Sequence, residues 1–394
     1  MRDLDSRDIR SYVLEHASEA EILLKELAVI PAPSGREGRR ADFCRKWLEA
    51  RGCRDVYVDD AGNVIYPYQV RQREKILAFM AHMDVVFEDD AYLQIRQKDR
   101  KLTGPGVGDD TANLANLMMA AAYFAEKQPD LQTGILFVMD TCEEGMGNLK
   151  GSRQIVNDFG SRLMAVIALD LYQGDYYTSF VGSCRWEIRV TAEGGHSYMD
   201  FGRSSAVEQI SRIVCRLYEQ KTPVSDRRPA ADEPVVNEPA ATYNVGMISG
   251  GTSVNTIAQE AKALYEVRSV DAGALTFMKE QFLQIIDAFR QEGMQIDLRL
   301  VGERPCAGEV DGRIMEMLGR AAHEVIAGSG LVPRRGSISS DSNIPVSMGI
   351  PSITLGTIIG GGAHTRQEWV DLDSQRTGIS MVLHMIGRVC SCFF

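Results

Sequence analysis

The sequence predicts an α/β protein in which a mixed β-sheet is flanked by helices and a smaller α+β domain is inserted into the chain. First, helix-patterned segments alternate with short, almost wholly apolar runs, which is typical of a sheet buried on both faces. Second, after about residue 182 the strand-like runs alternate polar and apolar residues, as half-exposed strands do. Third, the first pattern resumes after about residue 308.

The composition limits the classes of protein to which this chain can belong. It has 394 residues, with 43 Lys and Arg against 54 Asp and Glu, which gives a formal net charge of −11. At roughly 100–200 residues per domain, this length indicates two domains or one interrupted domain. Nucleic-acid binding needs clustered positive charge, so we expect no nucleic-acid partner for this acidic chain.

Sequence features favour a cytoplasmic location. No apolar run reaches the roughly 18 residues that a membrane helix needs, and the first residues are charged and helix-patterned, unlike a secretory signal. The eight cysteines are scattered without CxxC spacing, as expected of reduced thiols. We therefore expect a cytoplasmic protein with no membrane partner.

The elements of the first domain follow in chain order. Helices are expected at 7–28 and 38–52, and Ser34 with Glu37 has the spacing of a capping box before the second helix. The next predicted elements are strands at 55–58, 63–68 and 76–82, a helix at 110–127, and strands at 134–142 and 163–171. These elements would form the sheet and its first helical layer.

The segment from 181 to 303 has a β-α-β-β-α-β order of its own, which resembles a ferredoxin-like domain. Its predicted elements are strands at 185–192, 241–248, 260–267 and 295–301, helices at 205–218 and 274–291, and a polar, proline-bearing stretch at 221–239. Helices at 313–327 and 371–389 and a strand at 351–355 follow. The predicted domains are therefore 1–180 together with 304–394, and an inserted domain at 181–303.

Histidines and carboxylates recur where the predicted core strands end. They are His82, Asp84, Asp109, Glu143, Glu144, Asp170 and His364. Ligands in open α/β sheets bind outside the carboxyl ends of the strands, so these segments would bring O and N donors to one edge. Each segment alone has a structural interpretation, such as a surface His-x-Asp pair, a solvated Glu-Glu or a plain glycine turn. Their coincidence at the strand ends favours a metal site.

The motifs of the chain resemble those of one family. In order they are AHMDVV, GPGVGDDTANLA, TCEEGMGNLKG, ALDLY, GGHSYMD, GGTSVNTIA, VRS, SSDSN and GGAHTRQEWV. This series is similar to that of the co-catalytic, di-zinc metallopeptidase family of peptidase T, glutamate carboxypeptidase, aminoacylase and succinyl-diaminopimelate desuccinylase. The resemblance implies that Asp109 bridges two metal ions, with His82 and Asp170 completing one site and Glu144 and His364 the other. It also implies that the inserted domain is a lid and a dimerisation surface, so we expect a homodimer.

The chemistry of these residue types fits two divalent ions. Two ions about 3.5–4 Å apart hold a hydroxide between them and polarise the scissile carbonyl. A mixed His and carboxylate set suits Zn²⁺, and Mn²⁺ or Co²⁺ can use the same ligands. Glu143, beside the ligand Glu144, is expected to take a proton from the bridging water and pass it to the leaving amine. Asp84 is expected to accept the free ring N–H of His82.

Three residues of the inserted domain are expected to meet the substrate. His196 resembles the family histidine that stabilises the tetrahedral oxyanion, often across a subunit interface. Asn255 and Arg268 resemble residues that hold a substrate carboxylate, which the planar fork of Arg binds in two places. The alternatives are a loop histidine held by local backbone and a structural ion pair for Arg268.

The finer predictions depend on single positions. Ala81 stands where a glycine is common in the family and Thr111 where a Lys is frequent, whereas Asp170 resembles the aminopeptidase branch, since acylases and carboxypeptidases usually carry Glu there. We therefore predict a metal-dependent hydrolase that cleaves small peptides as an aminopeptidase of the tri- or dipeptidase kind. The alternatives are an N-acyl-amino-acid deacylase or glutamate carboxypeptidase-like enzyme, and an inactive binding or scaffold protein of the same fold.

Overall fold

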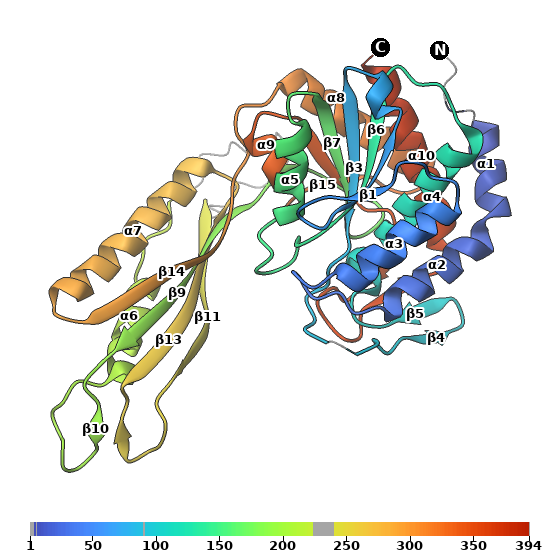
Figure 1. Cartoon of the computed structure of the whole chain (residues 1–394). Coiled ribbons are helices and arrows are strands. Elements are labelled where there is room, and N and C mark those ends of the chain that lie inside the picture. The colour runs from blue at the N-terminus through green and yellow to red at the C-terminus, as the bar shows by residue number, and fades with distance from the viewer. Residues whose placement is uncertain (1–3, 5, 90, 224–239, 394) are drawn as a thin grey trace. The chain divides into compact units, whose positions relative to one another are not determined.

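The structure, a computed structural model, describes residues 4, 6–89, 91–223 and 240–393 (Figure 1). It divides into two compact units: the first consists of Met1–Phe180 and Gly308–Phe394, and the second of Val181–Ala307. Most of the proline-bearing stretch predicted at 221–239 lies outside the described residues.

The first unit is built around an eight-stranded mixed sheet with the strand order β1-β2-β6-β3-β7-β16-β8-β15. Its strands are β1 (Tyr57–Val58), β2 (Val64–Tyr68), β3 (Ile76–His82), β6 (Gly134–Asp140), β7 (Leu163–Leu169), β8 (Asp175–Phe180), β15 (Arg334–Ile338) and β16 (Ser352–Leu355). The neighbours β6, β3, β7 and β16 run parallel, and every residue of β3 and β6 is buried. Their carboxyl ends therefore lie along one edge of the sheet.

Helices cover both faces of this sheet (Figure 1). They are α1 (Ser6–Glu15), α2 (Ala17–Val29), α3 (Gly38–Ala50), α4 (Asn113–Lys127), α5 (Lys150–Phe159), α8 (Gly312–Gly328), α9 (Asn343–Ser347) and α10 (Ser374–Cys392). Alternate residues of β3 enter different cores: Leu77 and Phe79 belong to the core that contains α4 and α10, while Ala78 and Met80 belong to the core with α5. The predicted sheet flanked by helices is thus confirmed.

A small four-stranded sheet joins two loops that are distant in the sequence. Its order is β17-β18-β5-β4, and its strands are β4 (Arg96–Lys98), β5 (Lys101–Thr103), β17 (Gly360–Gly361) and β18 (Trp369–Asp371). Thr103 pairs with Trp369 across β5 and β18. The segment after β5, which leads to Asp109, is therefore placed beside the β17–β18 connection, which carries His364.

The second unit has the predicted β-α-β-β-α-β order. Its main elements are β9 (Gly182–Thr191), α6 (Ala206–Tyr218), β11 (Ala241–Gly250), β13 (Glu260–Ser269), α7 (Ala272–Gln291) and β14 (Gln295–Arg304). The sheet is antiparallel with the order β11-β13-β9-β14, and both helices pack in one core with β9 and β13. A two-stranded ribbon, β10 (Gly195–His196) with β12 (Thr256–Ile257), extends from it.

Three local predictions differ from the structure. The helix predicted at 7–28 is two helices, interrupted at His16, whose φ of −100° and ψ of 9° leave the helical region. The capping box is wrong: α3 begins after Glu37, and the hydroxyl of Ser34 donates to Asp84 instead. The helix predicted from residue 110 begins at Asn113, because the preceding turn is kinked: Asp109, with a φ of −102° and a ψ of 95°, lies outside the helical region. In the part of the chain that the structure describes, every helix is too short or too polar to span a bilayer.

Candidate metal centre

The loop between β5 and α4 presents Asp109. Its backbone is held by Glu368, a fully buried residue whose carboxylate accepts the N–H groups of Gly106 (2.9 Å), Gly108 (2.9 Å) and Asp109 (2.6 Å). Gly106 has a φ of +66°, and a Cβ there would lie 2.3 Å from Val85, so this position requires glycine. The carboxylate of Glu368 thus fixes the loop by binding the loop's backbone N–H groups, and the side chain of Asp109 stays available for other contacts.

Asp109 lies between two histidines. Its Oδ1 is 3.2 Å from Nε2 of His82, and its Oδ2 is 3.2 Å from Nε2 of His364. Burial alone would raise the pKa of Asp109. The hydrogen bonds to His364 and His82, together with the charges of these two histidines, outweigh burial and hold that pKa below its usual range. A carboxylate that directs one oxygen to each of two donors has the arrangement of a bridging ligand.

Five predicted ligands come together as two groups that share Asp109. The ligand atoms of His82, Asp109 and Asp170 lie within 4.8 Å of one another, and so do those of Asp109, Glu144 and His364. Nε2 of His364 is also 3.3 Å from Oε1 of Glu144. The structure therefore groups these residues in the two sets that the resemblance implies.

The donor set fits two divalent cations. Oδ1 of Asp170 is buried and has no hydrogen-bond partner among the described residues, which is costly for a carboxylate unless a cation meets it. Burial, and then the charge of Asp109, raise the pKa of Asp170 well above its usual value and that of Glu144 to about 7. Cations between these carboxylates would remove that penalty, and a mixed set of imidazole and carboxylate donors suits Zn²⁺.

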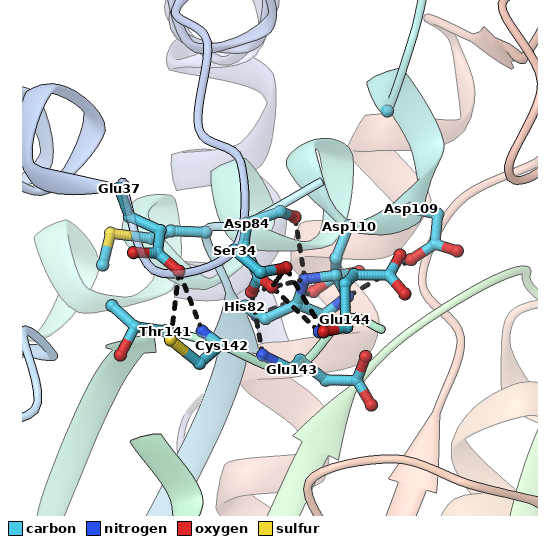
Figure 2. Close-up of polar contacts among 12 residues, drawn as sticks. Ser34, Glu37, His82, Asp84, Asp109, Asp110, Thr141, Cys142, Glu143 and Glu144 are labelled. Atoms are coloured by element: carbon cyan, nitrogen blue, oxygen red, sulfur yellow. Dashed lines mark hydrogen bonds and ion pairs between the residues drawn. The ribbon is translucent and has the colours of Figure 1, made fainter. Parts of the chain in front are cut away.

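Glu143 lies beside the ligands. Ligand atoms of His82, Glu143 and Glu144 lie within 4.8 Å of one another, and all three residues are buried. The backbone N–H of Glu143 donates to Oδ1 of Asp84 at 3.0 Å, and that of Glu144 donates to Oδ2 at 2.8 Å (Figure 2). Asp84 thus holds the backbone from which both glutamates project.

Asp84 contacts the ring of His82 through its backbone carbonyl and, at longer range, through its carboxylate. Nδ1 of His82 lies 3.0 Å from the backbone carbonyl oxygen of Asp84 and 3.5 Å from its carboxylate. The carboxylate is engaged by the two N–H groups above and by the hydroxyl of Ser34, which donates at 2.6 Å. Asp84 therefore fixes the tautomer of His82 through its carbonyl, which leaves Nε2 as the metal-binding nitrogen.

Several supporting residues were not predicted from the sequence. They are Ser34, Glu368 and Asp110, of which Asp110 accepts the backbone N–H of His82 at 3.1 Å and the side-chain amide of Asn113 at 2.6 Å. The peptide bond between Asp109 and Asp110 is cis. The available signal for Glu368 was its place four residues after His364, within the last motif of the chain.

His196, Asn255 and Arg268 lie in the second unit. Nδ1 of His196 accepts N–H groups of the following turn at 3.3 and 3.4 Å, which leaves Nε2 as the ring nitrogen that can donate. Oδ1 of Asn255 accepts the hydroxyl of Ser253 at 2.8 Å. Arg268 pairs with Glu266 at 3.0 Å and remains about one-third exposed. These contacts are all within the second unit, so a role for these residues at the metal centre stays a prediction.

The chain matches peptidase family M20/M25/M40 over residues 78–388. It is 26% identical over 273 residues to a probable carboxypeptidase of Arthroderma otae, and this match covers 64% of this chain and 59% of that protein. It is 25% identical over 368 residues to an acetylornithine deacetylase of Myxococcus xanthus, covering 89% of this chain and 91% of that one. A tripeptidase of Staphylococcus aureus has the same fold, with a TM-score of 0.74 and 20% identity over 95% of this chain and 99% of that one. Since the family match spans both units and every predicted ligand, the chain belongs to peptidase family M20/M25/M40, a family of hydrolases that act on amide bonds.

Proposed function

We propose that this protein is a metal-dependent hydrolase that cleaves the amide bond of small peptides as an aminopeptidase, with two divalent ions, most favourably Zn²⁺. One observation carries the proposal: Asp109 directs one carboxylate oxygen to His82 and the other to His364, and so belongs to both groups of ligand atoms. The family match supports the hydrolytic part of the proposal.

The residues of the chain divide the chemistry between them. When bound, two divalent ions lower the pKa of a water molecule and polarise the scissile carbonyl. Glu143 accepts the proton of the attacking water at its carboxylate and delivers it to the nitrogen of the leaving amine. Asp84 keeps Glu143 in place through the backbone hydrogen bond at 3.0 Å. His196 would donate from Nε2 to the carbonyl oxygen, and Asn255 and Arg268 would hold the substrate carboxylate.

The identity of the amide is the finer part of the proposal. Asp170, in place of Glu, supports a peptide-cleaving aminopeptidase of the kind that the resemblance implies. The second candidate is an N-acyl-amino-acid deacylase, which the acetylornithine deacetylase relative favours because the match covers 91% of that protein. A carboxypeptidase is supported by the probable carboxypeptidase of Arthroderma otae, although the match covers only 59% of that protein.

A substrate comparison separates these candidates. The protein loaded with Zn²⁺ is assayed on di- and tripeptides with a free N-terminus, on the same peptides with an acetylated N-terminus, and on N-acetyl and N-succinyl amino acids. We expect the free peptides to lose their N-terminal residue and the acetylated ones to be poor substrates, with turnover abolished by chelation and restored by Zn²⁺, Mn²⁺ or Co²⁺. A higher kcat/KM on N-acyl amino acids would identify a deacylase, and release of C-terminal residues a carboxypeptidase.

We also infer that the second unit forms a homodimer. The turn after His196 and the loop beside Asn255 expose four large apolar side chains, those of Tyr198, Met199, Phe201 and Val254. Each of them is at least 79% exposed. Exposed apolar patches are typical of interaction surfaces. Sedimentation velocity is expected to give a mass of two chains, and a monomer at micromolar concentration would contradict this inference.

A further inference from the structure

The two histidines of the metal centre are held in different ways. His82 is buried, its Nδ1 is held by the carbonyl of Asp84, and its backbone N–H is held by Asp110. The side chain of His364 is 58% exposed, whereas that of His82 is 1% exposed. Apart from the contacts of Nε2 with Asp109 and Glu144, the direction of the His364 ring depends on the backbone that carries it.

That backbone is anchored on both sides of His364. The N–H of Ala363 donates to the hydroxyl of Tyr172 at 3.1 Å, and the hydroxyl of Thr365 donates to the carbonyl of Gly362 at 2.7 Å. At the far end, Glu368 holds the loop of Asp109. These contacts hold residues 362, 363 and 365 and the far end at Glu368, and one further contact ties the segment to the surrounding chain.

Arg366 supplies this contact. Its guanidinium donates two hydrogen bonds to the carboxylate of Asp89, at 2.9 and 3.3 Å, and lies over the ring of Phe87 with 5.2 Å between Cζ and the ring centre. Phe87 and Asp89 belong to the segment that follows Asp84. The neighbouring Glu88 pairs with Arg36, from the turn after Ser34. Arg366 therefore ties the segment of His364 to the segment that follows Asp84.

We propose that Arg366 is a positioning residue for His364 and thereby sets the affinity of the metal site formed by Asp109, Glu144 and His364. The site formed by His82, Asp109 and Asp170 does not depend on it, because His82 is held by buried contacts of its own. An exposed ion pair adds little to overall stability. Its effect here is local, since Asp89 and Phe87 hold a planar guanidinium at three points, two residues from a ligand whose own side chain is exposed. The proposal rests on the proposed two-metal function.

The test measures zinc binding rather than turnover. Metal-free wild type, Arg366→Ala and Arg366→Lys are titrated with Zn²⁺ by calorimetry, and bound zinc is counted after dialysis against graded chelator concentrations. We expect Arg366→Ala to bind the first ion as the wild type does and the second about tenfold more weakly, the scale typical of residues that orient a ligand. Arg366→Lys, which keeps the charge but not the fork, should fall between the two.

Two further variants complete the design. Asp89→Asn weakens the same contact from the other side and should give the same selective loss, which keeps the test valid if Arg366→Ala folds poorly. Arg73→Ala is the matched control, because Arg73 pairs with Asp130 at 2.7 Å, also between two loops of the first unit. These loops precede β3 and β6, whereas His82 ends β3 and Glu144 follows β6. This control should bind both ions with wild-type affinity.

The outcomes separate this inference from the proposed function. Unchanged affinity for the second ion in both Arg366→Ala and Asp89→Asn would overturn the positioning role, and so would an equal loss at both sites. Wild type that binds fewer than two ions would instead overturn the proposed two-metal function. Selective loss of the second ion in both variants, with the Arg73→Ala control intact, would establish the role of Arg366.

Discussion

Glu143→Gln is expected to lower kcat by about 10²–10⁴-fold, the usual contribution of a general acid–base, while both metal ions stay bound. The amide has nearly the shape of the carboxylate but cannot accept the proton of the attacking water. The backbone hydrogen bond from residue 143 to Asp84 is unaffected, because it uses the main-chain N–H. The measurement is steady-state kinetics on the best peptide substrate together with the zinc content of the same preparation.

The neighbouring residue offers a matched comparison. Glu144→Gln makes the same chemical change one position along the chain, but Glu144 belongs to the group of Asp109 and His364, so this variant should lose affinity for one ion as well as turnover. Full turnover by Glu143→Gln with both ions bound would show that another group moves the proton. Loss of metal from Glu143→Gln would instead make Glu143 a ligand.

Asp109→Asn is expected to have the largest effect on metal binding, because Asp109 is the residue that the two groups of ligand atoms share. An amide offers one neutral oxygen in place of two charged ones, so both sites should weaken together and turnover should fall to background. Zn²⁺ raises the melting temperature of a protein that binds it in the folded state. We therefore expect Zn²⁺ to raise the melting temperature of the wild type far more than that of this variant.

The control for Asp109 is Asp170→Asn. Asp170 belongs to only one of the groups, so its amide variant should weaken one ion and spare the other. Asp109→Asn that binds zinc with the stoichiometry and affinity of the wild type would show that Asp109 does not bridge. Equal behaviour of the two variants would show that the sites do not share a ligand.

The sequence predicts best those parts of the fold whose signal is local. The strand at Ile76–His82 was placed with the observed bounds, and the next core strand ends at Asp140, two residues earlier than predicted. Both are runs of residues buried on both faces, so their apolar composition is sufficient evidence. The inserted unit is predicted from a different local signal, namely strands that alternate polar and apolar residues together with two helix patterns.

Elements that depend on distant partners were not predicted. The strands β5 and β18 are three residues each, and they form because Thr103 meets Trp369 from the other end of the chain. The edge strand at Arg334–Ile338 has no fully buried residue and so lacks an apolar pattern. Such pairings follow from tertiary contacts, which a window of local sequence does not contain.

The candidate site also contains residues with a local sequence signal and residues that depend on distant partners. The predicted ligands could be found because His and carboxylates are unusual at the ends of apolar strands. The residues that hold the ligands in place could not be predicted, because Ser34 and Glu368 bind groups that are 50 or more positions away in the sequence. Ser34 also illustrates a competing local pattern: its spacing to Glu37 fits a capping box, but in the fold its hydroxyl meets Asp84 at 2.6 Å.

The most direct test of the central claim is to count and locate the metal in the wild-type protein. Zinc per chain is measured after dialysis, and anomalous diffraction at the zinc edge locates each ion in a crystal. We predict two ions per chain, one among His82, Asp109 and Asp170 and the other among Asp109, Glu144 and His364. A single ion, or two ions without Asp109 between them, would contradict a two-metal centre bridged by this residue.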